Sequence, residues 1–289
     1  MKKTVFSFLF FLLVIALPFT IVSKDVSKSG AKKAIVIGAT SGMGREVAKL
    51  LSKEGYVLGL VGRRVMLLES LQESLEEDSY IKRIDVSDHE NAAVLLNELI
   101  EELGGLDLIM ISISSFIDTG FADTWEANKK IIDVDIAGFW VMAHTALQYF
   151  EQQKSGHLVG ISSIDGLRGS ASCPIFSGAK AFVSRYLEGV RNRMIRKKIP
   201  ICVTDIVPGW VNVEHTAFSA LPGTFWVSTK EEAAKQIVVA IKSKKKLAYI
   251  TKRWGIVALL LSFLPDVIYN NIDKLRVGVS RVLESAGLA

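Results

Sequence analysis

The chain has 289 residues, of which 49% are hydrophobic and 22% charged, and its formal net charge is +5. This length suits one large α/β domain or two smaller ones, and the hydrophobic content excludes a disordered chain. Two cysteines, Cys173 and Cys202, exclude a disulfide framework, and with four scattered histidines they form no zinc-binding spacing, so we expect no metal site. The positive charge forms no basic stripe interleaved with aromatic residues, so nucleic acid is not an expected partner.

The N-terminal segment is apolar. Residues 4–23 contain no charged side chain and follow Lys2 and Lys3. About 20 apolar residues cross the bilayer core as a helix. We therefore expect a signal anchor and linker over residues 1–31 and a membrane-associated protein; a cleaved signal peptide, which normally has a shorter apolar run, is the alternative. Lysines on the far side of the run favour a cytoplasmic location for the rest of the chain.

The middle of the chain, residues 32–250, alternates apolar runs with helical patterns. The expected strands are 34–38, 57–62, 80–85, 107–112, 157–163, 199–207 and 247–251. The expected helices end near Glu54 and Asp78 or cover 88–103, 126–153, 179–198 and 229–242. This alternation indicates βαβ units on a parallel sheet, and continuous apolar runs indicate strands that are covered on both faces. We predict one doubly wound α/β domain.

The C-terminal segment, residues 251–289, combines basic and apolar residues. Lys252 and Arg253 precede the apolar stretch 254–264, which is too short to span a bilayer and is closed by Pro265. A basic cluster beside a short apolar helix is typical of a segment that lies on anionic lipid. The alternative is a helix that packs on the domain's own core or on a second copy. Membrane lipid is therefore one expected partner.

A glycine-rich segment, GATSGMG, follows the first expected strand and opens a helix. Glycines here allow a tight turn and a close approach of the backbone to a pyrophosphate, which the helix N-terminus then stabilises. Its context, a strand followed by a helix within a βαβ unit, is what a dinucleotide-binding site requires. The residues expected to contact the cofactor are Gly38, Thr40, Ser41, Gly42, Met43 and Gly44.

The second expected strand ends before Arg63 and Arg64. A carboxylate at this point binds a ribose 2′-hydroxyl, whereas an arginine suits a 2′-phosphate, so the sequence favours NADP(H) over NAD(H). The alternative is that the two arginines are solvated charges at a helix N-terminus. Asp85 and Val86 follow the third strand, where a carboxylate can reach the adenine amino group.

These motifs together resemble the short-chain dehydrogenase/reductase family over roughly residues 32–250. The resemblance rests on the GxxxGxG spacing, the arginine after the second strand, Asp85-Val86, the ISS and FSGAK segments, and Pro208-Gly209. It implies a Rossmann-type sheet of about seven strands, a nicotinamide cofactor, hydride transfer between a carbonyl and an alcohol, and a dimer or tetramer formed through the helices near 126–153 and 179–198. It also implies cofactor contacts from Ser112, Lys180, Pro208, Gly209 and Val211.

The resemblance assigns catalytic positions but not the usual residues. Family members carry a serine, a tyrosine thirteen residues later that acts as general acid or base, and a lysine four residues after the tyrosine. Ser163 and Lys180 stand at the serine and lysine positions, but Phe176 replaces the tyrosine. Asp135 stands where the family has an asparagine. Two further departures are residues 111–114, in place of an NNAG segment, and Val213, in place of a threonine.

Two hypotheses follow. The first is an NADP(H)-dependent oxidoreductase with altered proton transfer, in which Ser163 orients the substrate oxygen and Lys180 holds the ribose. Trp210 and Trp226, in the loop after the sixth strand, suit a hydrophobic carbonyl or alcohol as substrate; the alternative is that these aromatic residues cover the core. The second hypothesis is a catalytically silent NADP-binding scaffold or sensor. The choice between the two hypotheses depends on whether the chain can transfer a proton without the hydroxyl that Phe176 lacks.

Overall fold

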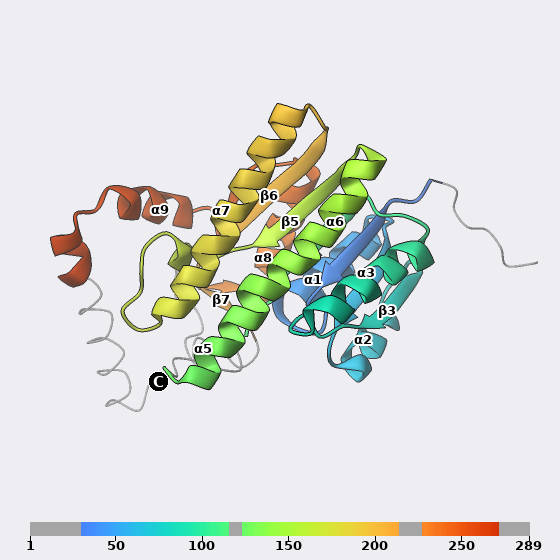
Figure 1. Ribbon diagram of the computed structural model, residues 1–289, viewed down its shortest axis with the longest axis horizontal. Helices are drawn as coiled ribbons and strands as arrows, with labels where there is room; N and C mark the ends of the chain where they lie inside the picture. The colour runs from blue at the N-terminus through green and yellow to red at the C-terminus, as the bar shows by residue number, and fades with distance from the viewer. Residues whose placement is uncertain (1–29, 116–122, 214–226, 272–289) are drawn as a thin grey trace, which may run out of the picture. The chain divides into compact units, whose positions relative to one another are not determined.

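The computed structural model of the chain describes residues 30–115, 123–213 and 227–271. Seven parallel strands form one sheet in the order β3-β2-β1-β4-β5-β6-β9 (Figure 1). They are β1 (Lys33–Ile37), β2 (Val57–Gly62), β3 (Ser79–Arg83), β4 (Leu108–Ile111), β5 (Gly156–Ile161), β6 (Ile201–Pro208) and β9 (Leu247–Ile250). A small second sheet pairs β7 (Val211–Asn212) with β8 (Ser228–Thr229). The strand order reverses between β1 and β4, which is where sheets of this kind bind their ligands.

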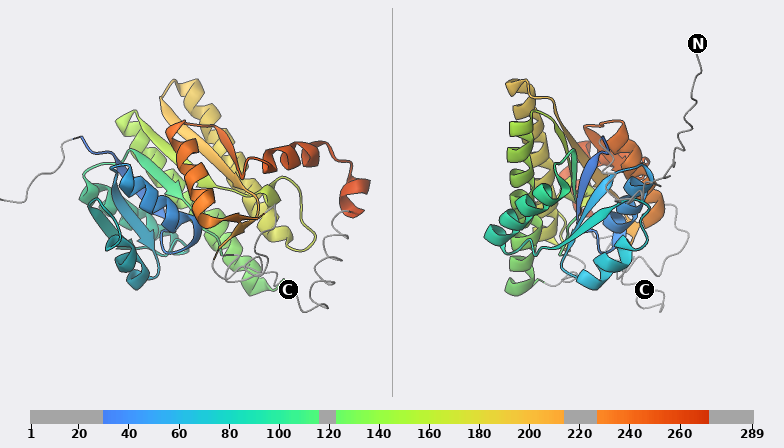
Figure 2. Two further views of the ribbon diagram at one scale, coloured as in Figure 1. Left: turned by 180° about the vertical axis from the view of Figure 1, so that it is seen from behind. Right: turned by 90° about the vertical axis from the view of Figure 1, so that its right-hand side faces the viewer.

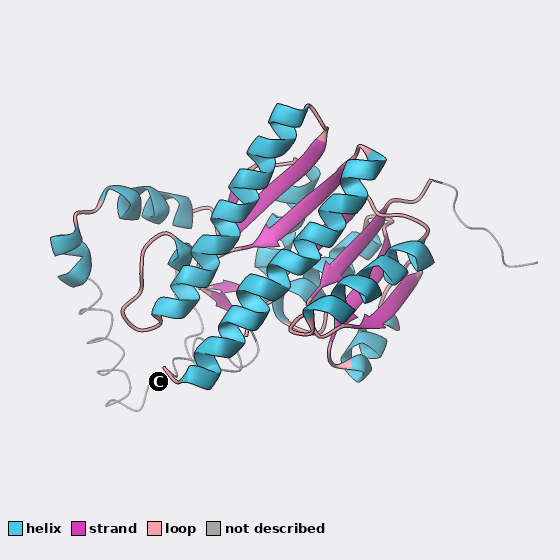
Figure 3. Ribbon diagram, in the orientation of Figure 1, coloured by secondary structure: helices cyan, strands magenta, loops and turns pink. Residues whose placement is uncertain are grey.

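Helices cover both faces of the sheet (Figures 1 and 3). The first face is covered by α1 (Gly42–Lys53), α2 (Val65–Gln72) and α8 (Lys230–Lys242). The second is covered by α3 (His89–Leu103), α6 (Phe139–Gln153) and α7 (Pro174–Lys197). Figure 2 shows α8 and α1 from behind, on the side of the sheet opposite α6 and α7. The remaining helical segments are α5 (Trp125–Ile131), η1 (Ile132–Gly138), η2 (Ile164–Gly166) and α9 (Trp254–Phe263).

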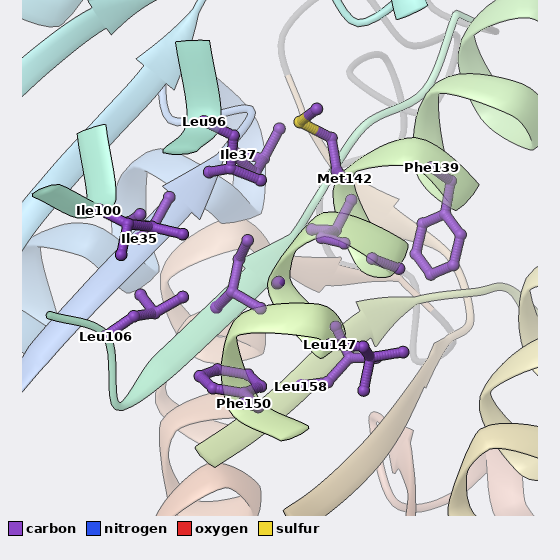
Figure 4. Close-up of a cluster of buried hydrophobic side chains, with 14 of the residues drawn as sticks. Ile35, Ile37, Leu96, Ile100, Leu106, Phe139, Met142, Leu147, Phe150 and Leu158 are labelled. Atoms are coloured by element: carbon purple, nitrogen blue, oxygen red, sulfur yellow. The ribbon is translucent and has the colours of Figure 1, made fainter. Parts of the chain in front are cut away.

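Each face of the sheet has its own apolar core. The core under α3, α6 and α7 joins Ile35 and Leu158 of the sheet to Phe139 and Phe150 of α6 (Figure 4). All four side chains are fully buried. Strands buried on both faces need continuous apolar runs, which explains why β4 (LIMI) shows no alternation of polar and apolar residues.

The predicted fold class, a doubly wound parallel sheet of about seven strands, is confirmed. The expected strand 57–62 coincides with β2. Three helices differ from the prediction. Helix α2 ends at Gln72 instead of near Asp78. Helix α7 begins at Pro174 instead of residue 179, because a proline at the first helical position lacks only an N–H group that has no intrahelical partner there. The expected helix 126–153 is divided by η1, a π-helical stretch that widens the helix in front of α6.

The membrane localisation predicted from the sequence is wrong for the part of the chain that the structure describes. No helix there is both long enough and apolar enough to cross a bilayer. The reason is length: a span needs about 20 apolar residues, whereas the apolar helix α9 has 10. The apolar run 4–23, on which the anchor and the cytoplasmic placement depended, lies outside the described residues, as does the loop residue Trp226.

Helix α9 belongs to the predicted C-terminal segment and packs one side on the domain. Trp254 and Ala258 are buried against Ile164. The other side carries exposed apolar residues, among them Leu260 and Phe263. Packing on the domain's own core, one of the two alternatives drawn from the sequence, therefore applies to the inner side of α9.

Candidate active site

A cavity of ≈ 500 Å³ lies at the carboxyl ends of β1, β4, β5 and β6. It spans the reversal of strand order between β1 and β4, where the fold is expected to bind a ligand. The structure brings to this cavity most of the residues that the sequence pointed to. They are Gly38, Thr40, Ser41, Gly42, Met43, Arg63, Arg64, Asp85, Val86, Ser112, Ser163, Phe176, Lys180 and Pro208.

Four predicted residues do not line the cavity. Gly44 lies inside α1, where a Cβ would stand 2.3 Å from the carbonyl oxygen of Gly38, so it serves close packing. Gly209 lies against Trp254 in the same way, with a Cβ position 2.1 Å from the indole Nε1. Val211 is buried in β7. Asp135 is fully buried behind the cavity, where it forms an ion pair with Lys180. Direct cofactor contacts from Gly44, Gly209 and Val211 therefore stay predictions.

The glycine-rich loop has the shape that a phosphate group requires. Gly38 and Gly42 adopt φ angles of +86° and +56°, a left-handed conformation that favours glycine. A Cβ on Gly38 would stand 2.1 Å from the carbonyl oxygen of Ser112, so the turn also needs the smallest residue for space. Ser41 precedes α1 but makes no side-chain cap to it. A helix N-terminus without such a cap, next to left-handed glycines, fits a pyrophosphate.

Arg63 and Arg64 occupy different environments, although the sequence treats them alike. The Arg64 guanidinium donates from Nη2 to Thr40 Oγ1 at 2.8 Å and to Ser41 Oγ at 2.9 Å, so it holds the glycine-rich loop. Arg63 lines the cavity beside Lys130 of α5. Sequence reasoning missed Lys130, because its helix is far from the arginines in the chain. The described rim of the cavity therefore has two cationic side chains at the end of β2 and a third on α5.

Asp85 follows β3 and is held by Ser87, whose N–H and Oγ donate to Asp85 Oδ1 at 3.0 and 2.7 Å. Burial raises the pKa of Asp85, but these hydrogen bonds and the charges of Arg63 and Arg83 outweigh it and lower the pKa below its usual range. The carboxylate is therefore ionised at neutral pH and accepts hydrogen bonds. Such an acceptor fits an adenine amino group, and the contact itself stays a prediction.

Ser163, Phe176 and Lys180 meet in the cavity. Ser163 ends the β5 segment and caps η2, accepting a hydrogen bond from the Asp165 N–H at 3.1 Å. Phe176 and Lys180 are four residues apart on α7 and so lie on the same side of that helix. Lys180 Nζ lies 5.4 Å from the centroid of the Phe176 ring. The sequence spacing thus brings together an alcohol and an ammonium group, with an apolar ring where the resemblance implies a phenol.

Lys180 and Asp135 form a buried ion pair. The two charged atoms, Lys180 Nζ and Asp135 Oδ1, are 3.1 Å apart, and the side chains are 5% and 0% exposed. Asp135 Oδ2 accepts hydrogen bonds from the N–H and Oγ of Ser115 at 2.7 and 2.6 Å. Lys180 Nζ also donates to the carbonyl oxygen of Ile113 at 3.2 Å. The pair joins η1, α7 and the segment after β4, and Ser115 is a site residue that the sequence did not indicate.

A second buried carboxylate, Asp205 of β6, supports the site from behind. Its two oxygens accept hydrogen bonds from Ser162 Oγ and Ser184 Oγ, each at 2.6 Å. Burial raises the pKa of Asp205 even though both hydrogen bonds lower it. The three residues tie β5 and β6 to α7, and therefore fix the strand end that carries Ser163 relative to Lys180. The sequence did contain an indication of this site residue, because Asp205 is a charged residue inside the largely apolar run 199–207.

Arg168 connects the segment after Ser163 to the C-terminal part of the chain. Its guanidinium donates to the carbonyl oxygens of Leu261 and Leu264 at 3.1 and 2.8 Å and pairs with Asp266 at 2.6 Å. It also lies 4.4 Å from the centroid of the Tyr269 ring. These contacts hold α9 beside η2, next to Ser163. Nothing in the sequence pattern indicated this connection, because the partners are more than 90 residues apart.

The fold and the site define a dinucleotide-binding α/β protein of the Rossmann type. The family model described as short chain dehydrogenase matches residues 32–220. The chain belongs to this family, as its resemblance implied. An uncharacterized oxidoreductase of Mycobacterium tuberculosis is 32% identical over 219 residues, covering 73% of this chain and 85% of the relative. Another, from Staphylococcus aureus, is 35% identical over 191 residues, covering 64% of this chain and 80% of the relative. The chain is thus related to oxidoreductases of this family.

Solved structures with the same fold are more distant in sequence. Ribose-5-phosphate isomerase from Brucella melitensis has a TM-score of 0.65 at 21% identity and covers 76% of this chain and 90% of its own. ElxO with NADP bound has a TM-score of 0.64 at 22% identity, and the match covers 76% of this chain and 97% of the ElxO chain. ElxO with a Tyr-to-Phe substitution and NADPH bound has a TM-score of 0.64 at 23% identity, with the same coverage. At these identities the likeness extends to the fold alone.

Proposed function

We propose that this protein is an NADP(H)-dependent oxidoreductase that interconverts a hydrophobic carbonyl compound and its alcohol. One observation carries the proposal: a single cavity joins the glycine-rich loop at the N-terminus of α1 to Ser163, Lys180 and the apolar side chain of Phe176. A dinucleotide bound to the loop would extend its reactive end toward these groups. Membership of the short chain dehydrogenase family supports the reaction type.

The residues present fit NADP(H). The left-handed glycines and the N-terminus of α1 would hold the pyrophosphate. Arg63 and Lys130, which line the same cavity, would hold the 2′-phosphate, since cationic donors suit a phosphate better than a ribose hydroxyl. Asp85 would accept from the adenine. Two solved structures of the same fold have NADP or NADPH bound, one of them with a Tyr-to-Phe substitution, so in that protein the change is compatible with cofactor binding. When bound, the cofactor supplies or accepts a hydride.

The substrate end of the cavity combines apolar side chains with Lys180 and with serines, among them Ser114 and Ser163. Phe176, Ile113 and Val213 line it. Ser163 Oγ would hold the substrate oxygen, and the apolar side chains would hold a hydrocarbon group and exclude water. A straight-chain aldehyde or a cyclic ketone without charge fits this lining better than a sugar or a charged metabolite.

The assembly in this proposal is a homodimer. The helix formed by α5, η1 and α6 presents Ile132 and Trp140 to solvent, with 40% and 44% of each residue exposed. Large apolar side chains exposed on one helix favour a helix-to-helix contact with a second copy. Sedimentation of the purified chain checks this expectation: a dimer supports it, whereas a monomer at micromolar concentration contradicts it.

The experiment that tests the activity combines binding with turnover. Purified protein is titrated with NADPH and with NADH while cofactor fluorescence is followed, and NADPH consumption is then measured with hexanal, decanal and cyclohexanone. We expect NADPH to bind at least about tenfold more tightly than NADH, because each charge-assisted contact to the 2′-phosphate contributes about 1.5–3 kcal/mol, and we expect decanal to be reduced faster than hexanal. Absence of NADPH binding contradicts the proposal.

A second candidate function has one observation in its favour. Phe176 places an apolar ring where family members carry a tyrosine, so the chain suits a silent NADP-binding scaffold or sensor. This candidate predicts NADPH binding without consumption of cofactor with any carbonyl compound. The same titration and turnover assay therefore separates the two functions.

A further inference from the structure

Lys180 lies next to both Phe176 and Asp135, and it carries acidic protons on a side chain that lines the cavity. Its ammonium has three protons. Two oxygen acceptors lie near Nζ, namely Asp135 Oδ1 at 3.1 Å and the carbonyl oxygen of Ile113 at 3.2 Å. Asp135 is fully buried behind Lys180, whereas Lys180 and Ile113 both line the cavity. Three protons face at most two such oxygens, so the ammonium keeps at least one proton for a ligand in the cavity.

Asp135 keeps this ammonium in place. Its carboxylate is fully buried, and its second oxygen accepts two hydrogen bonds from Ser115, so it has no freedom to turn away. An asparagine at this position, which the family resemblance implies, would supply a dipole but no charge. A carboxylate instead supplies a full negative charge at ion-pair distance from Nζ. The substitution at position 135 thus places a fixed anion behind the lysine in the same site that lacks a phenol at position 176.

No tyrosine among the described residues can replace the missing phenol. Tyr186 packs in the apolar core, with its ring centroid 6.2 Å from that of Phe139, and Tyr149 belongs to the same core. Tyr249 packs in the cluster around Trp254. None of them lines the cavity. Ser163 is an aliphatic alcohol, a much weaker acid than a phenol or an alkylammonium, so it suits orientation of the substrate oxygen.

We propose that Lys180 is the catalytic proton donor of the oxidoreductase, acting directly on the substrate oxygen, with Asp135 as its positioning residue. This inference rests on the function proposed above. Lysine and tyrosine side chains in water have nearly the same acidity, with pKa values of about 10.4 and 10. An alkylammonium can therefore perform the proton transfer that a phenol performs, provided that it faces the cavity.

The step balances as follows for reduction. A hydride, with its electron pair, passes from the reduced nicotinamide of NADPH to the carbonyl carbon, and the π electrons of the C=O bond move to the oxygen. The oxygen takes one proton from Lys180 Nζ, and the N–H bond breaks as the O–H bond forms. The carbonyl compound is reduced to an alcohol, the nicotinamide is oxidised, and the neutral amine of Lys180 regains its proton from water. Oxidation runs through the same steps in reverse, with the amine as base.

The test removes the amine and then returns it from solution. Lys180→Ala is assayed with NADPH and decanal alone, with methylammonium and with tetramethylammonium. We expect kcat to fall about 10²–10⁴-fold, the usual contribution of general acid catalysis. Methylammonium, which has protons to donate, is expected to raise the kcat of Lys180→Ala at least tenfold. Tetramethylammonium has the charge but no acidic proton and is expected to restore nothing.

A second variant and a second readout guard against a folding defect. Lys180→Met fills the same space without an amine, and fluorescence titration reports NADPH binding for every variant. We expect Lys180→Met to bind NADPH within about tenfold of the parent, to lose kcat as Lys180→Ala does, and not to respond to methylammonium. Asp135→Asn is expected to lower kcat with little change in KM, whereas Asp133→Asn, two residues away on the surface, is expected to change neither.

Each contrary result has a distinct meaning. Retention of kcat by Lys180→Met or Lys180→Ala overturns the lysine donor and leaves the oxidoreductase intact. Equal rescue by the two ammonium ions shows that the lysine contributes only charge, and it also overturns the donor. If the parent protein binds NADPH and reduces no carbonyl compound, the lysine donor and the oxidoreductase both fail. Loss of NADPH binding alone in the variants, with kcat unchanged at saturation, assigns Lys180 to the ribose and overturns the inference.

Discussion

The two halves of the cavity differ in how closely they follow the family pattern. The half beside β1, β2 and β3 has the glycine-rich loop, Arg63 and Asp85 in the arrangement that a dinucleotide requires. The half beside β4, β5 and β6 keeps Ser163 and Lys180 but has Phe176 and Asp135 at two other catalytic positions. Under the proposed function, the difference teaches that cofactor binding and proton transfer would depend on separate sets of residues. Either set can therefore change while the sheet and the other set stay the same.

The largest expected effect belongs to the cofactor half. Gly38→Ala places a Cβ 2.1 Å from a backbone oxygen of Ser112 and forces a left-handed φ on alanine. We expect a loss of about 3–5 kcal/mol in the free energy of unfolding and no NADPH binding. Gly189→Ala, on the exposed side of α7 with no atom within 4 Å of its Cβ, is the matched control and is expected to gain about 1 kcal/mol. Urea unfolding compares the two, and equal stabilities would refute the close packing of the loop.

The next effect belongs to the catalytic half. Asp135→Ala leaves the Lys180 ammonium buried without its carboxylate, and breaking such a pair costs about 3–5 kcal/mol. Asp133→Ala removes the exposed partner of Lys129, for which we expect a change of about 0–1 kcal/mol. The two acids lie on the same π-helical stretch, so they differ chiefly in burial. Guanidinium unfolding of both variants measures the contrast, and a small effect for Asp135→Ala would mean that the pair is solvated.

A pH effect is expected from β5, at the end of the strand opposite Ser163. Burial lowers the pKa of His157 to about 4, with a smaller contribution from the charge of Lys244. Because the unfolded chain binds the proton more readily, stability is full above a pH of about 6.5 and is lost as the pH falls toward about 4, by roughly 3 kcal/mol. His157 Nε2 donates to Thr204 Oγ1 at 2.8 Å, since that hydroxyl itself donates to the carbonyl oxygen of Lys245.

His157→Gln keeps a donor for Thr204 but removes the titration. The variant is expected to lose the part of the pH dependence between pH values of about 4 and 6.5, as measured by urea unfolding at several pH values. An unchanged slope would assign the acid sensitivity to other groups. Asp205 would not be one of those groups, because its raised pKa increases the stability of the fold as the pH falls.

The smallest expected effect concerns cofactor choice. Arg63→Ser removes a guanidinium from the rim of the cavity while Arg64 continues to hold the loop. We expect NADPH to bind about 30-fold more weakly, equivalent to a charge-assisted hydrogen bond of about 2 kcal/mol, and NADH to bind as before. Arg185→Ser, an exposed arginine of α7, is the control. A parallel loss for NADPH and NADH would mean that Arg63 contributes to the loop and not to the phosphate.

The sequence by itself determined the fold class and the place of the glycine-rich loop between a strand and a helix. Apolar runs without alternation indicate strands buried on both faces, and a glycine-rich turn between a strand and a helix has few structural solutions, so local pattern is enough. The sequence pattern also identified Ser163, Phe176 and Lys180. A spacing of four residues places Phe176 and Lys180 on the same side of one helix. The membrane prediction depended on the apolar run 4–23, which lies outside the described residues, and no helix that the structure describes is long and apolar enough to cross a bilayer.

Only the tertiary structure decided which charges meet. The Lys180–Asp135 pair, the Asp205 cluster and the contacts of Arg168 each join segments that are distant in the chain. Ion pairs and hydrogen bonds depend on distances of a few ångströms between side chains, and no sequence period encodes such distances for residues on different elements. The sequence therefore showed that position 176 lacks a phenol. The structure showed that Lys180, which is paired with the buried carboxylate of Asp135, lies beside the Phe176 ring.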